Sequence, residues 1–307
     1  MHVTVDGITK TSTHKTKAEA EAWAVRMREE MRALSGGVSL THTVKDALER
    51  YARDVSPKKK GVQWELRRLA AFGRDPLADV KLCTVKPPDI AEWRDRRLKE
   101  VSGSTVNREL NLLSNVFAIA RDEWGWIAES PTRKVRRPKE SAPRDRLISQ
   151  KEAEYILVAL GYSPELDTIE SRVGRAFLFA LETAMRAGEI CALEAHSVKG
   201  RVARLEDSKN GSRRDVPLSA RAVEIWEEAG GKGFGLISSQ IDANFRKAKK
   251  RAGIADITFH DTRHTAITRL AKRIDVLALA RMTGHKDIKQ LMTYYNETAE
   301  EVAKLLD

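Results

Sequence analysis

Six side chains in the C-terminal half of the chain are of the types needed to cut a phosphodiester bond without a metal. Two arginines can hold the non-bridging oxygens of a phosphoryl transition state, because each guanidinium is permanently charged and donates paired hydrogen bonds. A tyrosine hydroxyl can form a covalent bond to phosphorus, and a lysine can protonate the departing oxygen. In chain order, these residues are Arg186, Lys209, His260, Arg263, His285 and Tyr294.

The local sequence assigns roles to the residues around the two arginines. Arg186 and Arg263 are predicted to clamp the phosphate, and Glu189 is predicted to support Arg186 through an ion pair three residues along a helix. His260 precedes Arg263 by three residues, which places both on one helical face, and is the predicted general base. Lys209 stands directly before an Asn-Gly pair, the strongest short signal for a β-hairpin. It is therefore predicted to lie at a hairpin tip and to act as the general acid.

Tyr294 is the predicted nucleophile, and Tyr295 is its rival. Adjacent residues of a helix point about 100° apart, so only one of them can face the phosphate. A free phenol has a pKa of about 10, so the nucleophile needs a base or positive neighbours at neutral pH. His285 is predicted to donate a hydrogen bond to the phosphate.

His260 and His264 stand four residues apart, which is a spacing found in metal-binding helices. The residues between them lack the glutamate of a zinc protease helix, so we expect neither a metal nor another cofactor, and His264 is interpreted as structural. Cys83 and Cys191 have no metal-ligand neighbour at Cys-x-x-Cys spacing and are interpreted as buried thiols.

The ordered series of residues resembles that of the tyrosine recombinases, the phage integrase family. Residues 180–190, Ala-Leu-Glu-Thr-Ala-Met-Arg-Ala-Gly-Glu-Ile, are similar to the first arginine box of that family. The similarity runs from about residue 40 to the C-terminus. The resemblance implies a site-specific recombinase that cleaves double-stranded DNA through a 3′-phosphotyrosine, exchanges strands in pairs and rejoins them without metal or nucleotide.

The resemblance further implies a phage or prophage integrase that acts as a homotetramer on DNA, with host DNA-bending or directionality factors as additional partners. A shufflon-type DNA invertase is the alternative, because the sequences around Arg186 and Lys209 are equally similar to those enzymes. A non-catalytic DNA-binding regulator would account for the basic charge but not for the series of arginines and tyrosine. A type IB topoisomerase shares the chemistry without depending on paired sites.

The charge of the chain favours a polyanionic partner. The 307 residues carry 55 Lys and Arg against 44 Asp and Glu, a formal net charge of +11, and most of the excess lies between residues 38 and 140. No apolar run is long enough to span a bilayer, and the N-terminus lacks the apolar core of a signal peptide, so a cytoplasmic location is expected. Clusters of one charge sign predict contacts to DNA phosphates by Lys58, Lys59, Lys60, Arg133, Lys134, Arg136 and Arg137.

The pattern of apolar residues and capping signals predicts a mainly α, multidomain chain. A short β-α segment, a reduced form of an arm-site domain, is expected over 1–37, and a helical core-binding (SAM-like) bundle over 38–130. A basic, proline-containing linker is expected over 131–143, and a mixed, mostly helical catalytic domain with a small β-hairpin sheet over 144–307. Beyond Tyr294, the apolar residues Val302, Leu305 and Leu306 predict a short helix that docks on protein surface. The resemblance implies docking on a neighbouring protomer, and docking on the same domain is the alternative.

Overall fold

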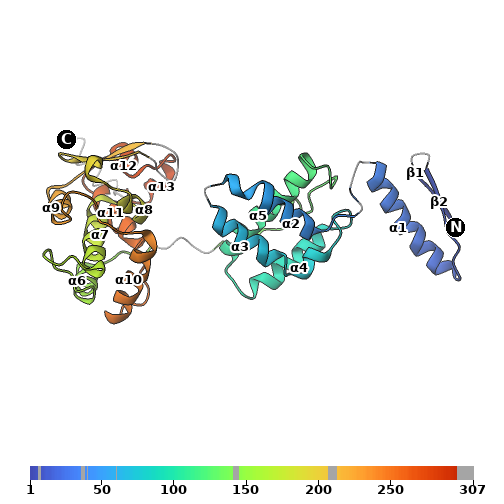
Figure 1. Ribbon diagram of the computed structural model, residues 1–307, viewed down its shortest axis with the longest axis horizontal. Helices are drawn as coiled ribbons and strands as arrows, with labels where there is room; N and C mark the ends of the chain where they lie inside the picture. Colours follow the sequence, from blue (N-terminus) through green and yellow to red (C-terminus); the bar gives the residue numbers. More distant parts are fainter. Residues whose placement is uncertain are drawn as a thin grey trace, which may run out of the picture. The chain divides into compact units, whose positions relative to one another are not determined.

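The computed structural model describes residues 1–5, 8–35, 39, 41–59, 61–140, 145–206 and 213–295. The chain divides into two compact units, Met1–Pro143 and Arg144–Asp307. Helices dominate both, and the strands of the described residues form one two-stranded and one three-stranded antiparallel sheet (Figure 1). The expected fold class is therefore confirmed. Along the described stretches, no helix is both long and apolar enough to cross a membrane.

The N-terminal segment is a hairpin followed by a helix. Strands β1 (His2–Val5) and β2 (Ile8–Thr11) pair antiparallel, and α1 spans Lys17–Ser35. The predicted capping residue is in place, because the backbone N–H of Glu19 donates to Thr16 Oγ1 at 3.2 Å. One face of the helix packs on the hairpin through a small core of Val3, Ala24 and Met31, flanked by Trp23 and Met27.

Four helices form a bundle in the rest of the first unit. They are α2 (Val44–Asp54), α3 (Val62–Phe72), α4 (Pro87–Leu98) and α5 (Gly103–Asp122), with short 3-10 turns at Ser56–Lys58 and Pro76–Asp79. Thr43 and Asp46 form a reciprocal capping box at the start of α2, and Pro87 opens α4 as predicted. The buried stripe on α5 includes Val106, Leu110, Leu113 and Phe117 and forms the centre of the bundle core.

Residues 131–140, the first part of the expected linker, pack on this bundle. Arg137 Nη1 donates to the carbonyl of Asn107 at 3.0 Å, and Asn107 Nδ2 donates to the carbonyl of Pro138 at 3.0 Å. A Cβ atom at Gly103 would lie 2.3 Å from the carbonyl oxygen of Lys139, so a glycine is required where the two segments cross. The prolines keep this segment out of a helix as expected, but polar contacts with α5 hold it on the bundle.

Helix α7 (Ile169–Thr183) lies at the centre of the second unit. It packs against the three helices α9, α10 and α11, whose bounds follow. The other elements of this unit are α6 (Gln150–Ala159), α8 (Ala187–Cys191), a 3-10 turn at Ala195–Ser197, β3 (Val198–Lys199), β4 (Val202–Leu205), β5 (Arg214–Pro217), α9 (Ala220–Glu228), α10 (Ser238–Arg251), α11 (Asp261–Ala271), α12 (Val276–Thr283) and α13 (Lys289–Met292). The predicted capping box at Ser149 and Glu152 opens α6.

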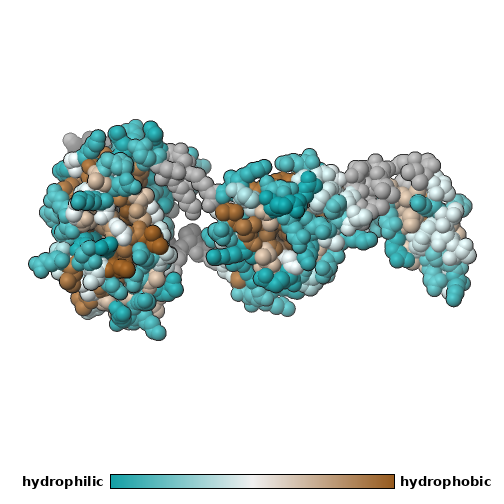
Figure 2. Space-filling view, viewed as in Figure 1, coloured by the Kyte–Doolittle hydropathy of each residue, from teal (hydrophilic) through white to brown (hydrophobic). Residues whose placement is uncertain are grey.

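The small sheet of this unit has the strand order β3-β4-β5. Strands β4 and β5 pair antiparallel, with Val202 opposite Pro217 and Leu205 opposite Arg214, as the Asn-Gly signal predicted. The hairpin tip, which includes Lys209, lies outside the described residues. On the face seen in Figure 2, hydrophilic side chains cover most of both units, as a chain with 32% charged residues requires.

Candidate active site

The turn between α7 and α8 positions Arg186. Helix α7 ends at Ala184, which has φ 56° and ψ 17°, and Arg186 is the N-cap residue of α8. A left-handed conformation costs a non-glycine residue about 1–2 kcal/mol, so Ala184 is a strained position. Its carbonyl accepts a hydrogen bond from Arg263 Nη1 at 2.7 Å. The strained turn therefore links α11 to the start of α8, where Arg186 lies, and both helices contact α7 (Figure 1).

Glu189 joins the first arginine to a second one. It is only 6% exposed, and it accepts hydrogen bonds from Arg186 through the backbone N–H at 2.9 Å and Nη1 at 2.8 Å. Arg214 Nη1 and Nη2 donate to the same carboxylate at 3.0 and 2.7 Å. Burial alone would raise the pKa of Glu189, but Arg214 and the backbone N–H of Arg186 outweigh it and lower the pKa. Glu189 is therefore a charged link at the base of the site.

Arg214 is a residue of this cluster that the sequence did not indicate. Its Nε also donates to the carbonyl of Met282 at 3.0 Å, which connects β5 to α12. Gly284, with φ 74°, ends α12, and a Cβ atom there would lie 3.1 Å from Arg214 Cδ. The alternation of the strand could have identified this arginine, because Arg214 shares its face with the buried Val216.

Arg263 lies on α11 and is 4% exposed. Its Nη1 donates to the carbonyl of Ala184 and its Nη2 to the carbonyl of Thr283, each at 2.7 Å. These bonds use two of its five N–H groups and leave three for a ligand. Burial and the neighbouring positive charge of Arg186 lower the pKa of Arg263 to about 9, so the guanidinium remains charged at pH 7.

His285 is held by the end of α12. The hydroxyl of Thr283 donates its proton to the carbonyl of Leu279 at 2.6 Å. The Thr283 oxygen must therefore accept from His285 Nδ1, which lies 2.7 Å away. In the neutral ring, Nε2 then carries no proton. Burial and the charges of Arg263 and Arg186 lower the pKa of His285 to about 4. The predicted donation to a phosphate therefore requires protonation of Nε2, which the negative charge of the phosphate favours.

The two candidate nucleophiles have different partners. Tyr294 and Tyr295 follow α13 in a turn, and the Tyr294 hydroxyl lies 2.6 Å from His264 Nδ1. The Tyr295 hydroxyl donates to the carbonyl of Ile274 at 2.8 Å. Burial raises the pKa of Tyr294, and the positive charge of Arg263 opposes that rise. Tyr294 therefore lies near enough to Arg263 to feel its positive charge.

The histidine that contacts Tyr294 is the one that the sequence analysis treated as structural. His264 Nε2 lies 2.9 Å from Asp145 Oδ1, so His264 contacts an acidic residue on one side and the tyrosine on the other. His260 is the exposed residue directly before α11. No sequence signal linked Asp145 or Tyr294 to His264, because the three meet only in the folded chain. Among the described residues, no group of three or more His, Cys, Asp or Glu side chains could hold a metal ion.

The predicted phosphate contacts on the first unit are not alike. Lys59 Nζ donates to Glu65 Oε1 at 3.0 Å and to the Tyr51 hydroxyl, so a carboxylate of the bundle competes with a phosphate for this lysine. Lys58 is exposed, and Lys60 lies outside the described residues. The remaining four predicted contacts are exposed; they are Arg133, Lys134, Arg136 and Arg137. Arg133 and Lys134 line a groove of about 560 Å³ together with Lys86 and Arg121.

A family model and individual relatives identify the same protein family. Residues 146–301 match the model of the phage integrase family. A putative integrase/recombinase of Haemophilus influenzae is 37% identical over 303 residues, which cover 96% of this chain and 100% of the relative. A shufflon-specific DNA recombinase of Escherichia coli is 37% identical over 277 residues, which cover 85% of this chain and 71% of the relative.

Solved structures share the fold at lower identity. A lambda integrase dimer bound to a COC′ core site superposes with a TM-score of 0.71 at 20% identity, over 94% of this chain and 89% of that one. A lambda integrase tetramer bound to a Holliday junction gives 0.70 at 19% identity over the same shares of the two chains. These structures establish similarity of fold.

Proposed function

The chain belongs to the phage integrase family and is a tyrosine-type site-specific recombinase, and from this premise we propose that it cleaves DNA by joining Tyr294 to a 3′-phosphate. The observation that carries the proposal is the position of Tyr294 beside Arg263, in a cluster that also holds Arg186 and His285. These groups come from α8, α11, the end of α12 and the turn after α13, so they converge only through the fold.

In the proposed reaction, the Tyr294 oxygen attacks phosphorus and the bond from phosphorus to the 5′ oxygen breaks. Arg186 and Arg263 bind the non-bridging oxygens, where negative charge accumulates. Lys209, at the hairpin tip outside the described residues, gives its proton to the departing 5′ oxygen. Rejoining is the reverse, because a 5′ hydroxyl attacks the phosphotyrosine and releases Tyr294. The phosphoester is conserved throughout, so no nucleotide is consumed.

The remaining polar residues prepare the phosphate site before DNA arrives. Glu189 fixes the backbone and side chain of Arg186, and Arg214 holds Glu189. His285 completes the site once the phosphate has favoured protonation of its Nε2. His260, exposed at the start of α11, belongs to the same proposed set. Groups that are already oriented need no reorganisation during the reaction, which is the main source of electrostatic catalysis.

We extend the proposal to DNA binding and assembly. The exposed Arg133 and Lys134 line a basic groove of the bundle and are proposed to contact DNA phosphates. Lambda integrase has been solved as a tetramer on a Holliday junction, and four copies of this chain are proposed to pair two DNA sites in the same way. The tail residues Val302 and Leu305, which lie outside the described residues, would join neighbouring copies.

The test is covalent capture on DNA that contains candidate recombination sites. A nick beside the scissile phosphate lets the cleaved fragment diffuse away, so the parental protein should accumulate an adduct that survives denaturant. Tyr294→Phe should give no adduct at nearly unchanged DNA affinity, and Tyr295→Phe should still give it. Peptide mass mapping should place the nucleotide on Tyr294. Adduct formation by Tyr294→Phe on a specifically bound site would refute the assignment.

DNA inversion is the second candidate activity, because the Escherichia coli relative named a shufflon-specific DNA recombinase has the same 37% identity as the Haemophilus influenzae one, although over a shorter stretch. The two activities differ in the arrangement of sites that they join. An invertase should act on two inverted sites within one plasmid. An integrase should join sites on separate molecules, so a plasmid assay that offers both arrangements distinguishes them.

A further inference from the structure

Two contacts of His264 are left unused by the reaction outlined above. We propose that His264 is the general base that removes the proton from Tyr294, and that Asp145 is the positioning residue that holds the imidazole for this task. The proposal rests on the proposed function and names the group that activates its nucleophile. It replaces the sequence-based assignment of the base to His260.

The hydrogen bonds of the ring determine which nitrogen is free to accept a proton. A carboxylate only accepts, so the contact of 2.9 Å between His264 Nε2 and Asp145 Oδ1 places the ring proton on Nε2. Nδ1 of the neutral ring then has a lone pair, and it lies 2.6 Å from the Tyr294 oxygen. The tyrosine hydroxyl must therefore be the donor. A nucleophile bonded to a base, with the base oriented by an acid, is the arrangement that activates hydroxyl nucleophiles.

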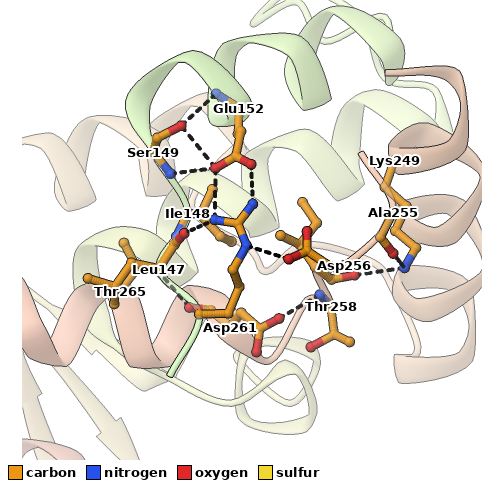
Figure 3. A network of polar contacts seen from close by, with 12 residues as sticks. Leu147, Ile148, Ser149, Glu152, Lys249, Ala255, Asp256, Thr258, Asp261 and Thr265 are labelled. Atoms are coloured by element: carbon orange, nitrogen blue, oxygen red, sulfur yellow. Dashed lines mark hydrogen bonds and ion pairs between the residues drawn. The ribbon is translucent and has the colours of Figure 1, made fainter. Parts of the chain in front are cut away.

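Hydrogen bonds to α11 hold the segment from Asp145 to Ile148. The backbone N–H of Ile148 donates to Thr265 Oγ1 at 2.9 Å, one residue beyond His264. Arg146 binds Glu152 at the start of α6, and its Nε donates to Asp256 Oδ2 at 3.0 Å in the loop before α11. Figure 3 shows this network, in which the backbone N–H of Ser149 donates to Glu152 and that of Thr258 donates to Asp261. Asp145 therefore directly precedes a segment that is anchored beside His264.

The burial of the three groups agrees with these roles. The side chain of His264 is 20% exposed, and Tyr294 packs on the apolar cluster that also contains Leu279 and Leu291. Asp145 is 94% exposed, so its bond to the ring is weak in water and contributes orientation more than energy. Loss of the base should therefore have a larger effect than loss of its positioning residue.

The proposed step balances without another reactant. As the Tyr294 oxygen bonds to phosphorus, its proton moves to His264 Nδ1, and the ring becomes an imidazolium stabilised by Asp145. When the phosphotyrosine is later attacked by a 5′ hydroxyl, the same nitrogen returns the proton to the Tyr294 oxygen. The base is restored after each cycle of cleavage and rejoining.

The first experiment separates proton transfer from positioning. In His264→Asn, the amide oxygen stands near the place of Nδ1 and can still accept a hydrogen bond, but it is not a base at neutral pH. Covalent capture on the nicked substrate should slow by about 100-fold or more, within the usual range for general base catalysis. DNA affinity and the thermal unfolding midpoint, measured on the same samples, should stay close to the parental values.

The decisive readout is rescue by a more acidic phenol. When Tyr294 is replaced by 3,5-difluorotyrosine, the nucleophile ionises near neutral pH and needs the base less. The rate ratio between the parental protein and His264→Asn should then fall from about 100 to less than about 10. A ratio that the fluorinated residue leaves unchanged would show that His264 only positions Tyr294, and an unslowed His264→Asn would exclude both roles.

Asp145→Asn tests the positioning residue, and Asp167→Asn is its control. Asp167 is also highly exposed, at 72%, and is bound by Arg172 elsewhere in the same unit. Asp145→Asn should slow capture about 3- to 30-fold because the amide can donate to Nε2 and favour the wrong tautomer, while Asp167→Asn should retain the parental rate. Equal rates for the two variants would remove Asp145 from the proposal. Failure of the parental protein to form any adduct would instead overturn the proposed function.

Discussion

On one side of the active site, Glu189 is 6% exposed and receives four hydrogen bonds from Arg186 and Arg214; on the other side, His264 is oriented by Asp145, which is 94% exposed. We call the first group, with Arg263, the arginine side, and the second, with Tyr294 and Tyr295, the tyrosine side. The arginine side is interlocked and buried, whereas the tyrosine side depends on a few partly exposed contacts. The proposed phosphate site is thus held by buried ion pairs, whereas the proposed nucleophile is held by partly exposed groups.

The largest effect should follow from breaking the buried link of the arginine side. Glu189→Gln removes the negative charge that pairs with Arg186 and Arg214 and leaves both cations uncompensated. Removal of one partner of a buried ion pair typically costs about 3–5 kcal/mol. We expect the free energy of unfolding of the second unit, measured by urea denaturation, to fall by about that amount.

Glu206→Gln provides the matched control for this prediction. Glu206 also pairs with an arginine, because Arg213 Nε lies 2.9 Å from its carboxylate, but the two side chains are 55% and 81% exposed. Surface pairs of this kind are worth about 0–1 kcal/mol, so the control should change stability only slightly. Equal costs at the two glutamates would show that the arginine side is no more interlocked than the surface.

The pH dependence of stability tests whether burial and the nearby arginines together lower the pKa of His285. Its pKa is lowered from the ordinary value of 6.5 to about 4 in the folded chain, so the unfolded chain binds the proton more tightly between these values. Stability should therefore fall as the pH decreases from about 6.5 towards 4. His285→Asn should remove part of this acid sensitivity, about 1–2 kcal/mol after allowance for solvent screening. Denaturation at pH 7 and pH 5 measures it, and identical slopes for both proteins would contradict the prediction.

On the tyrosine side, Tyr295→Phe should have a modest effect. It removes the hydrogen bond to the carbonyl of Ile274 and leaves the ring in place. Such a bond contributes about 0.5–1.5 kcal/mol, so the free energy of unfolding should fall by about 1 kcal/mol. Covalent capture should stay within a few-fold of the parental rate. A loss comparable to that of Glu189→Gln would mean that the tyrosine side is as rigidly built as the arginine side.

The smallest effect should be a gain in stability at the strained turn. Ala184 has φ 56°, which glycine adopts without steric cost, so Ala184→Gly should stabilise the protein by about 0.5–1 kcal/mol. Ala192→Gly is the control, because Ala192 also ends a helix but has an ordinary φ of −89°. Thermal unfolding compares the two variants. A destabilised Ala184→Gly would show that the methyl group contributes more through packing than the backbone loses through strain.

Local signals were sufficient to locate most of the elements. Thr43 and Ser149 cap α2 and α6 as residues of a typical capping type, and β4 and β5 flank the Asn-Gly pair that predicts a hairpin. The pair of Arg186 and Glu189 was also visible, since residues three apart meet on one helical turn. These features depend on neighbours within a few positions along the chain.

Contacts between distant segments could not be predicted in this way. Asp145 meets His264 across 119 positions, and no periodicity links the two residues. Lys59 was grouped with its neighbouring lysines by charge, although Glu65 on the next helix binds it. In both cases the partner is chosen by tertiary packing, which a single sequence does not display. The sequence therefore indicates which residue types are candidates for the site, but not which of them contact one another.

The orientation of Arg263 depends on the main chain, since two peptide carbonyls, those of Ala184 and Thr283, accept its hydrogen bonds. Every amino acid carries the same carbonyl, so substitutions at those two positions keep both acceptors as long as the backbone path is preserved. Arg214 differs, because two of its nitrogens depend on the single carboxylate of Glu189. Mutational drift around Arg263 can thus proceed without compensating substitutions, whereas Arg214 and Glu189 must evolve together.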